Sequence, residues 1–316
     1  MPEVFRQEQI EQIMRKHFPS TNVTRIQPVT TGKFNSSYFV STAENDYVVR
    51  IAPAKSEFFV FYEKNMMAQE PELHQIIRQQ TSVPVPEIFV YDTDHDIIAN
   101  DFLIMQRLPG RPASDARFLT NRLWHKALFQ IGDFLRQVHD LTAEHYGYLG
   151  AHHPMPPQQT WHEAFAIMWS KMICQLGEIN AYSENDVQFL LDLFEKHSDI
   201  FHRDVPASLL HMDVWAQNIL VDANGNVTGL LDWDRALWGD PEIEFAVLDY
   251  CGISEPAFWH GYGRERDESP DAKIRFVFYY LYELQKYIII RGKRNGSWSQ
   301  AMQYKAESLR IAQQLA

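Results

Sequence analysis

The sequence predicts an α+β fold with two lobes, in which an antiparallel β lobe with one helix precedes a mainly helical lobe. A chain of 316 residues exceeds the size at which a single hydrophobic core usually stops growing, so two lobes are expected. β-rich runs dominate roughly the first 105 residues, and apolar residues at helical spacing dominate from about 115 onward. The pattern changes near the Pro-Gly-Arg-Pro segment, and we place the boundary between 1–107 and 108–316.

The elements of the first lobe follow in order. Residues 6–18 have apolar side chains at helical spacing, which predicts an amphipathic helix. Two β-rich runs, SYFVST and YVVRIA, flank the turn-forming residues 43–46, which is typical of an antiparallel hairpin. Residues 57–80 are predicted to form a helix, because Pro71 can occupy a first helical turn. VPVPEIFVYD and DFLIMQRLPG then predict two further strands.

The second lobe is predicted to be helical from about 115 to 200 and again from 240 onward. Between these parts, the apolar runs NILVD and VTGLLD flank Ala-Asn-Gly-Asn, and Asn-Gly is a strong hairpin signal. Charged and amide residues interrupt the aromatic segment 276–290, which favours a buried helix over a membrane span.

The composition excludes several classes of partner. A net charge of −12 opposes binding to a nucleic acid or to an anionic membrane surface, and it favours a cationic small molecule. The two cysteines lack metal-ligand spacing, and the first 18 residues lack the apolar stretch of a secretory signal. We therefore expect a cytoplasmic protein that is a monomer or a homodimer.

Two aspartates, Asp204 and Asp213, compete for the role of a phosphoryl-transfer base. Such a site needs one carboxylate for the acceptor hydroxyl and a nearby oxygen ligand for a metal. In the protein-kinase catalytic loop these are Asp and Asn, in the order D-x-x-x-x-N. Asn218 stands five residues after Asp213, whereas Leu209 stands at that distance from Asp204. The spacing selects Asp213.

A second metal ligand is predicted at Asp232. The hairpin after Asn218 returns the chain toward the start of its first strand, so Asn218 and Asp232 should meet at its open end. Two oxygen ligands suit Mg²⁺, which completes its shell with water and phosphate oxygens.

Together, HMDVWAQNILVD and GLLDWDRALWGDPEIEFA resemble the H-x-D-x-x-x-x-N and D-W-D…G-D-P motifs of the aminoglycoside phosphotransferase and choline kinase superfamily. This resemblance implies a protein-kinase-like fold, Mg²⁺, and ATP or GTP bound between the lobes. It extends to TTGKFNSSYFV, which resembles the nucleotide loop, to YVVRIAP, and to FLIMQRLPG, which resembles the hinge between the lobes. The nucleotide-binding residues that the resemblance implies are Gly32, Ser36, Ser37, Arg50, Glu70, Gln106 and Leu108.

Arg50 stands where the family often has Lys, and it would contact the nucleotide phosphates. Its partner on the following helix is expected to be Glu70, with Glu72 as the alternative.

Three further residues are expected to support the site. His211 is expected to brace the catalytic loop rather than act as an acid or base. Asp234 would point away from Asp232 if the strand continues, where it could contact substrate or simply end the strand. Asp240, in Gly-Asp-Pro before a helix, is expected to cap that helix or brace the loop.

The acceptor is not determined by the motifs. Net acidity and abundant tryptophan favour an aminoglycoside or a similar amine-bearing sugar, although core packing is the simpler interpretation of each tryptophan. Kinases of fructosamines, choline or ethanolamine, homoserine, methylthioribose and macrolides are alternatives, as is a nucleotide-binding pseudoenzyme. The mixed-charge run 264–273 is interpreted as a solvated loop rather than a cation-binding cleft.

Overall fold

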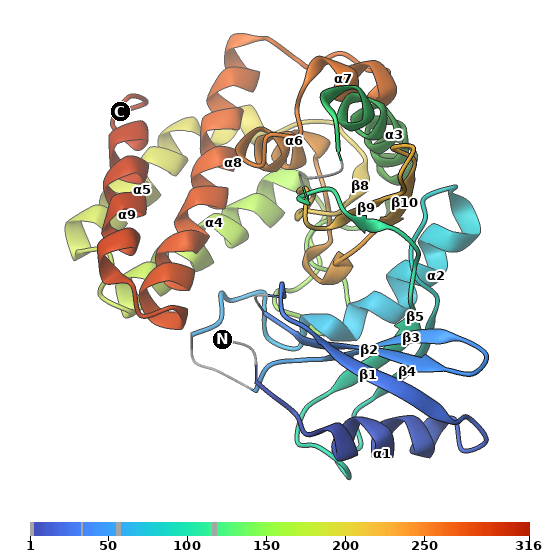
Figure 1. The fold of residues 1–316 in the computed structure, drawn as a ribbon. Coiled ribbons are helices and arrows are strands. Elements are labelled where there is room, and N and C mark those ends of the chain that lie inside the picture. Colours follow the sequence, from blue (N-terminus) through green and yellow to red (C-terminus); the bar gives the residue numbers. More distant parts are fainter. Residues whose placement is uncertain (1–2, 33, 55–57, 116–118) are drawn as a thin grey trace.

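The computed structural model describes residues 3–32, 34–54, 58–115 and 119–316. It confirms the predicted α+β fold, because a β lobe lies against a larger helical lobe (Figure 1). The proposed boundary after residue 107 falls between β5 (Phe102–Gln106) and β6 (Arg111–Pro112).

The described part of the first lobe forms a five-stranded antiparallel sheet with strand order β1-β2-β3-β5-β4. One face packs against α1 (Gln7–His17), which contributes Ile10, Ile13 and Met14 to the core of this lobe. Helix α2 (Glu70–Gln80) lies on the other face, toward the helical lobe (Figure 1). The other strands are β1 (Val23–Val29), β2 (Ser36–Thr42), β3 (Asp46–Ile51) and β4 (Ile88–Asp92).

Strand β3 determines where Arg50 points. Tyr47, Val49 and Ile51 alternate along the strand and join the core beneath α1. Because successive side chains of a strand point to opposite faces, Arg50 lies on the face of α2. Its guanidinium contacts Glu70 at the start of that helix.

The predicted helix over 57–80 is wrong in its first part. Residues 58–65 form turns, a short 3₁₀ turn spans Met66–Gln69, and α2 begins only at Glu70. The side-chain amide of Gln175 donates to the Phe59 carbonyl at 2.6 Å and accepts from the Phe61 amide at 3.0 Å. These tertiary hydrogen bonds replace those that a helix would have made.

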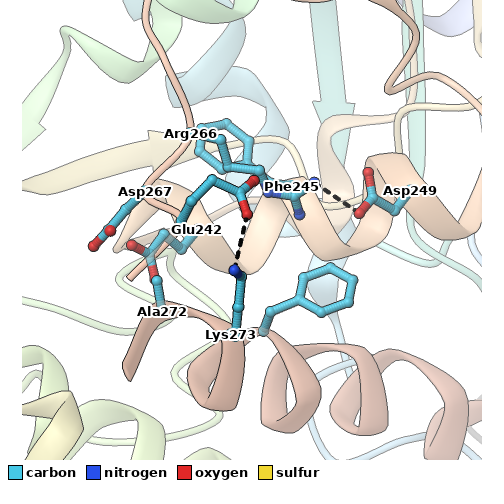
Figure 2. A pocket seen from close by; sticks show the side chains of 9 residues that line it. Glu242, Phe245, Asp249, Arg266, Asp267, Ala272 and Lys273 are labelled. Atoms are coloured by element: carbon cyan, nitrogen blue, oxygen red, sulfur yellow. Dashed lines mark hydrogen bonds and ion pairs between the residues drawn. The ribbon is translucent and has the colours of Figure 1, made fainter. Parts of the chain in front are cut away.

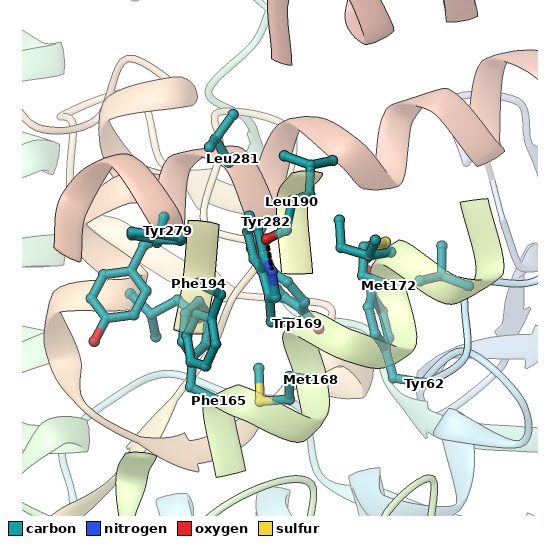
Figure 3. Packing of buried hydrophobic residues seen from close by; sticks show 14 of the residues in the cluster. Tyr62, Phe165, Met168, Trp169, Met172, Leu190, Phe194, Tyr279, Leu281 and Tyr282 are labelled. Atoms are coloured by element: carbon teal, nitrogen blue, oxygen red, sulfur yellow. Dashed lines mark hydrogen bonds between the residues drawn. The ribbon is translucent and has the colours of Figure 1, made fainter. Parts of the chain in front are cut away.

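The second lobe contains the helices that the apolar spacing predicted. Its largest hydrophobic cluster packs α4, α5 and α8 together, and the Trp169 indole N–H donates to the Leu190 carbonyl at 3.1 Å (Figure 3). Tyr62 of the first lobe joins the same cluster. The helices are α3 (Asn121–His139), α4 (Trp161–Glu178), α5 (Glu184–His197), α6 (Pro241–Tyr250), α7 (Pro256–Tyr262), α8 (Pro270–Ile289) and α9 (Trp298–Ala312).

The aromatic segment 276–290 lies almost entirely within α8, and many of its side chains are buried in the lobe. A single π-helical turn, Ile290–Arg294, then separates α8 from α9. Across the described ranges, no helix combines the length and apolarity that crossing a membrane requires.

The predicted hairpin is present as β9 (Ile219–Val221) and β10 (Val227–Leu230), with Gly225 in the left-handed region at φ 72°. Helix α3 fixes its turn, because Lys126 donates to the Asn224 carbonyl at 3.0 Å and Gln130 to the Gly225 carbonyl at 3.0 Å. Beside it, β8 (Ala207–Leu210) pairs with β11 (Leu237–Gly239) and with β7 (Thr142–Ala143). Strand β8 leads directly into the candidate site.

Candidate functional site

Asp213 lies in the loop between β8 and β9 with both carboxylate oxygens engaged. Arg235 donates to Oδ1 at 2.6 Å, and the side-chain amide of Asn218 donates to Oδ2 at 3.0 Å. The side chain is 24% exposed, so a small molecule can still reach it. Burial of the carboxyl opposes ionisation, but the charges of Arg235 and Lys286 outweigh it and hold the pKa of Asp213 below its ordinary value. The group is a carboxylate at neutral pH.

His211 links the predicted catalytic loop, residues 211–218, to the residue before Asp232. Its Nδ1 accepts from the Asp213 amide at 3.2 Å, so Nε2 carries the proton and donates to the Leu231 carbonyl at 2.9 Å. Burial lowers the pKa of His211, which keeps the ring neutral. With both ring nitrogens engaged inside the protein, the residue fixes the loop.

Glu244 on α6 accepts hydrogen bonds from the predicted catalytic loop, and the sequence did not reveal this role. Its buried carboxylate accepts from the Met212 amide at 2.6 Å, from the His211 amide at 3.1 Å and from His139 Nε2 at 2.8 Å. Met212 has a φ of 64°, an unfavourable region for a side chain of this type, and these bonds hold it there. The available signal was one glutamate within the otherwise apolar run IEFAVL.

Asn218 and Asp232 lie at the open end of the hairpin. The Leu231 amide donates to the Asn218 carbonyl at 2.9 Å, which places Asp232 one residue beyond that pair. The side-chain nitrogen of Asn218 donates to the Asp213 carbonyl and carboxylate, so its oxygen remains available as a ligand. The carboxylate of Asp232 is 38% exposed.

Arg50 lies among three acids. It contacts Glu70 and Asp234 at 2.6 Å each and also pairs with Asp232, whereas Glu72 is exposed on the far side of the helix turn. Burial raises the pKa of Glu70 to about 8, although Arg50 opposes this, and burial together with Asp232 raises the pKa of Asp234 to about 7. One guanidinium is too little positive charge for three carboxylates.

This deficit of positive charge fits a divalent cation at Asn218 and Asp232. Within the described ranges, no three His, Cys, Asp or Glu side chains are grouped as metal ligands. Two protein oxygens suit Mg²⁺, which keeps several waters and binds mainly through substrate phosphates. The donor set therefore fits the predicted metal.

The expectation that Asp234 points away from Asp232 is wrong, because residues two apart in a strand share a face and because β10 ends at Leu230, before either aspartate. Asp232 has a φ of 72°, and a short 3₁₀ turn, Trp233–Arg235, follows it. Both aspartates consequently contact Arg50, and Asp234 also accepts from the Asn35 side chain at 3.2 Å. Its carboxylate is buried between the lobes rather than exposed to a substrate.

Asp240 caps α6, where its carboxylate accepts from the Glu242 amide at 3.0 Å and pairs with Arg203. Contacts to the catalytic loop come from Glu244 instead. Asp204, the rejected alternative base, is exposed in the segment before β8.

The residues assigned to the nucleotide loop are distributed between a turn and a strand. Gly32 is exposed in the turn, and a Cβ there would lie 3.1 Å from the Asn35 carbonyl. Ser36 and Ser37 begin β2, and the Ser36 hydroxyl donates to the Glu3 carbonyl at 2.5 Å. The side chain of Ser36 is thus engaged inside the first lobe.

At the hinge, the backbone N–H of Gln106 donates to the Glu87 carbonyl at 2.8 Å and is occupied. Leu108 lies beyond the end of β5, and its side chain packs over Gly229 of the hairpin.

A cavity of about 200 Å³ lies on another side of α6 (Figure 2). Its α6 residues are on the face opposite Glu244, so the helix separates the cavity from the catalytic loop. The run 264–273 contributes to it, and its charges pair locally, as Arg266 does with Asp249 at 2.9 Å. The lining residues are Glu242, Phe245, Asp249, Arg266, Asp267, Glu268, Ala272, Lys273 and Phe276.

Comparisons with known proteins identify the family and the fold. Residues 25–274 match the profile of the phosphotransferase enzyme family. The probable ketoamine kinase of Vibrio parahaemolyticus is 26% identical over 273 residues, which cover 83% of this chain and 85% of that protein. A thermostable mutant of the aminoglycoside phosphotransferase APH(4)-Ia superimposes with a TM-score of 0.69 at 16% identity, covering 97% of this chain and 99% of that one. A related mutant, solved as a ternary complex with AMP-PNP and hygromycin B, has a TM-score of 0.67 at 16% identity and covers 96% and 98%.

Proposed function

Because this chain belongs to the phosphotransferase enzyme family and is a small-molecule kinase, we propose that it transfers the γ-phosphoryl group of ATP or GTP to a hydroxyl of a ketoamine. The observation that carries the chemistry is the arrangement of Asp213, Asn218 and Asp232 around one end of a hairpin. A pseudoenzyme has no evident need for this complete set.

Each residue has a separate task in the proposed reaction. Asp213 orients the acceptor hydroxyl and accepts its proton during in-line transfer, and Arg235 and Asn218 hold its carboxylate for this. Arg50, held by Glu70, binds the nucleotide phosphates. Asn218 and Asp232 would hold Mg²⁺, which when bound supplies positive charge to the phosphate oxygens. Because phosphoryl transfer needs little covalent help, positioning provides most of the acceleration.

Support for the acceptor class comes from the curated relatives. The probable ketoamine kinases of Vibrio parahaemolyticus and Lactiplantibacillus plantarum match this chain over 83% and 88% of its length. A ketoamine carries sugar hydroxyls beside a basic nitrogen, and a protein of net charge −12 attracts such a cation.

An aminoglycoside is the second candidate, which the sequence alone favoured. The complex with hygromycin B supports it, but that protein is 16% identical and shares with this chain the fold alone.

The test is an ADP-release assay with Mg-ATP and then Mg-GTP across ketoamines, aminoglycosides, choline, homoserine, methylthioribose and macrolides. A ketoamine should stimulate ADP release, and Asp213→Asn should reduce kcat by about 10²–10⁴-fold, the usual contribution of a general base. Stimulation by aminoglycosides alone would select the second candidate. Nucleotide binding without stimulation by any acceptor would favour the pseudoenzyme.

A further inference from the structure

The π-helical turn between α8 and α9 carries a side chain that reaches the other lobe. The Asn295 amide donates to the Ile290 carbonyl at 2.9 Å, which closes this wide turn. From its end, the Arg294 guanidinium pairs with Glu63 and lies over the ring of Phe34, 4.8 Å from the centroid. Single π turns inside helical segments occur frequently at functional sites.

Phe34 belongs to the candidate nucleotide loop, between Gly32 and the start of β2. The next residue, Asn35, donates to Asp234, which pairs with Arg50. Two adjacent residues of this loop are therefore held from outside it. Asn35 connects the loop to the acids around Arg50, and Phe34 connects it to the C-terminal helices.

The site that receives Arg294 in the first lobe is formed by buried and hydrogen-bonded residues. Glu63 is 5% exposed, and its carboxylate also accepts from the Val60 amide at 2.8 Å. The ring of Phe59 lies 5.3 Å from that of Phe34, and the Phe59 carbonyl accepts from Gln175 of α4. Glu63 would be a buried, unpaired charge without the arginine, which is costly inside a protein.

Helix α8 connects this contact to the catalytic base. Glu283 pairs with Arg235 at 3.4 Å and also with Lys286, and Arg235 holds the Asp213 carboxylate. About three turns further along the same helical segment, Arg294 contacts Phe34 of the nucleotide loop. The helical segment from α8 to the π turn thus contacts both Arg235, which holds the proposed base Asp213, and the loop that we expect over the nucleotide phosphates.

We propose that Arg294 is a positioning residue that holds Phe34 of the nucleotide loop against the C-terminal helices. This inference rests on the proposed function, because it assigns the loop around Gly32 to the nucleotide. Arg294 touches none of the reacting groups and acts through Phe34 and Glu63. Without it, the nucleotide must position Phe34, which the protein now positions in advance.

The experiment measures binding of Mg-AMP-PNP by calorimetry, which needs no acceptor. Arg294→Ala is expected to raise the Kd about tenfold, which corresponds to about 1.4 kcal/mol. Phe34→Ala should raise the Kd by the same or a smaller factor, and the double variant should bind no more weakly than Arg294→Ala, because Arg294→Ala already lacks the contact with Phe34. Arg294→Lys keeps the charge but not the planar contact with the ring, so it should lie between wild type and Arg294→Ala.

Arg291→Ala is the matched control, because this arginine of the same turn lies 5.9 Å from the Tyr287 ring within its own lobe. Its Kd should equal that of wild type. A Kd for Arg294→Ala within twofold of wild type, or additive effects in the double variant, would overturn the inference. If Arg294→Ala fails to fold, Phe34→Ala and Arg294→Lys still decide the matter. Wild type that does not bind nucleotide would instead refute the proposed function, and the inference with it.

Discussion

The contact between α6 and the catalytic loop gives the sharpest prediction, for Glu244→Gln. Three donors converge on the Glu244 carboxylate, namely the amides of His211 and Met212 and the ring of His139. Glutamine offers one oxygen and one NH₂ group in place of two oxygens. His139 can change tautomer, but in either amide orientation one of the two backbone N–H groups loses its acceptor.

The expected loss of stability follows from the number of hydrogen bonds that Glu244→Gln removes. A buried donor without a partner costs about 1–3 kcal/mol, and the loss of a charged acceptor from the remaining bonds adds about 1 kcal/mol. We expect a total destabilisation of about 2–4 kcal/mol. With a denaturant slope of roughly 3 kcal/mol/M in urea, the unfolding midpoint should fall by roughly 1 M. Since Met212 determines where Asp213 points, kcat should fall as well.

The assay is urea unfolding followed by tryptophan fluorescence, together with kcat for the acceptor that the panel identifies. Glu72→Gln is the matched control, because it makes the same chemical change at an exposed position of a helix. Its free energy of unfolding should stay within about 0.5 kcal/mol of that of wild type. A Glu244→Gln protein with an unchanged midpoint and unchanged kcat would refute the assignment of these three hydrogen bonds.

Three other outcomes are expected. Glu70→Gln should weaken Mg-AMP-PNP binding about tenfold, because Glu70 holds Arg50, whereas Glu72→Gln should leave the calorimetric Kd unchanged. Arg50→Met should bind Mn²⁺ more tightly than wild type without nucleotide, because the guanidinium now neutralises Asp232; equal affinities by electron paramagnetic resonance would contradict this. Burial opposes ionisation of Asp92, but hydrogen bonds from basic residues of α1 hold its pKa below the ordinary value. Its stabilisation is therefore present above the unfolded carboxyl pKa of about 3.9 and is lost as the pH falls through the lower folded pKa. The acid-unfolding profile of Asp92→Asn should lack this pH-dependent loss of stability. A profile identical to that of wild type would contradict the role assigned to these hydrogen bonds.

Local signals predicted much of the fold and of the site. The Asn-Gly turn and the two apolar runs determine the β9–β10 hairpin, since strand pairing across a short turn depends on neighbouring residues alone. The same hairpin brings Asn218 near Asp232, so their meeting followed from spacing. The roles assigned to these residues stay predictions.

Contacts between residues far apart in the chain could not be predicted from the sequence. Glu63 and Arg294 are 231 positions apart, and nothing near either residue indicates the other. Gln175 likewise draws residues 58–65 out of a helix by hydrogen bonds that no local pattern encodes. Glu244 was missed because a glutamate on a helix usually faces solvent, and only the fold shows that this one faces the loop.

The clamping of the hairpin turn by α3 has a consequence for how such enzymes diversify. Lys126 and Gln130 fix the far end of the hairpin, while Glu244 fixes the catalytic loop at the other end. Neither anchor belongs to α5, which packs in the hydrophobic cluster with α4 and α8. Mutations in α5 can therefore accumulate while the hairpin and the loop that carries Asp213 keep their anchors, whereas mutations in α8 would also reach Asp213 through Glu283 and Arg235.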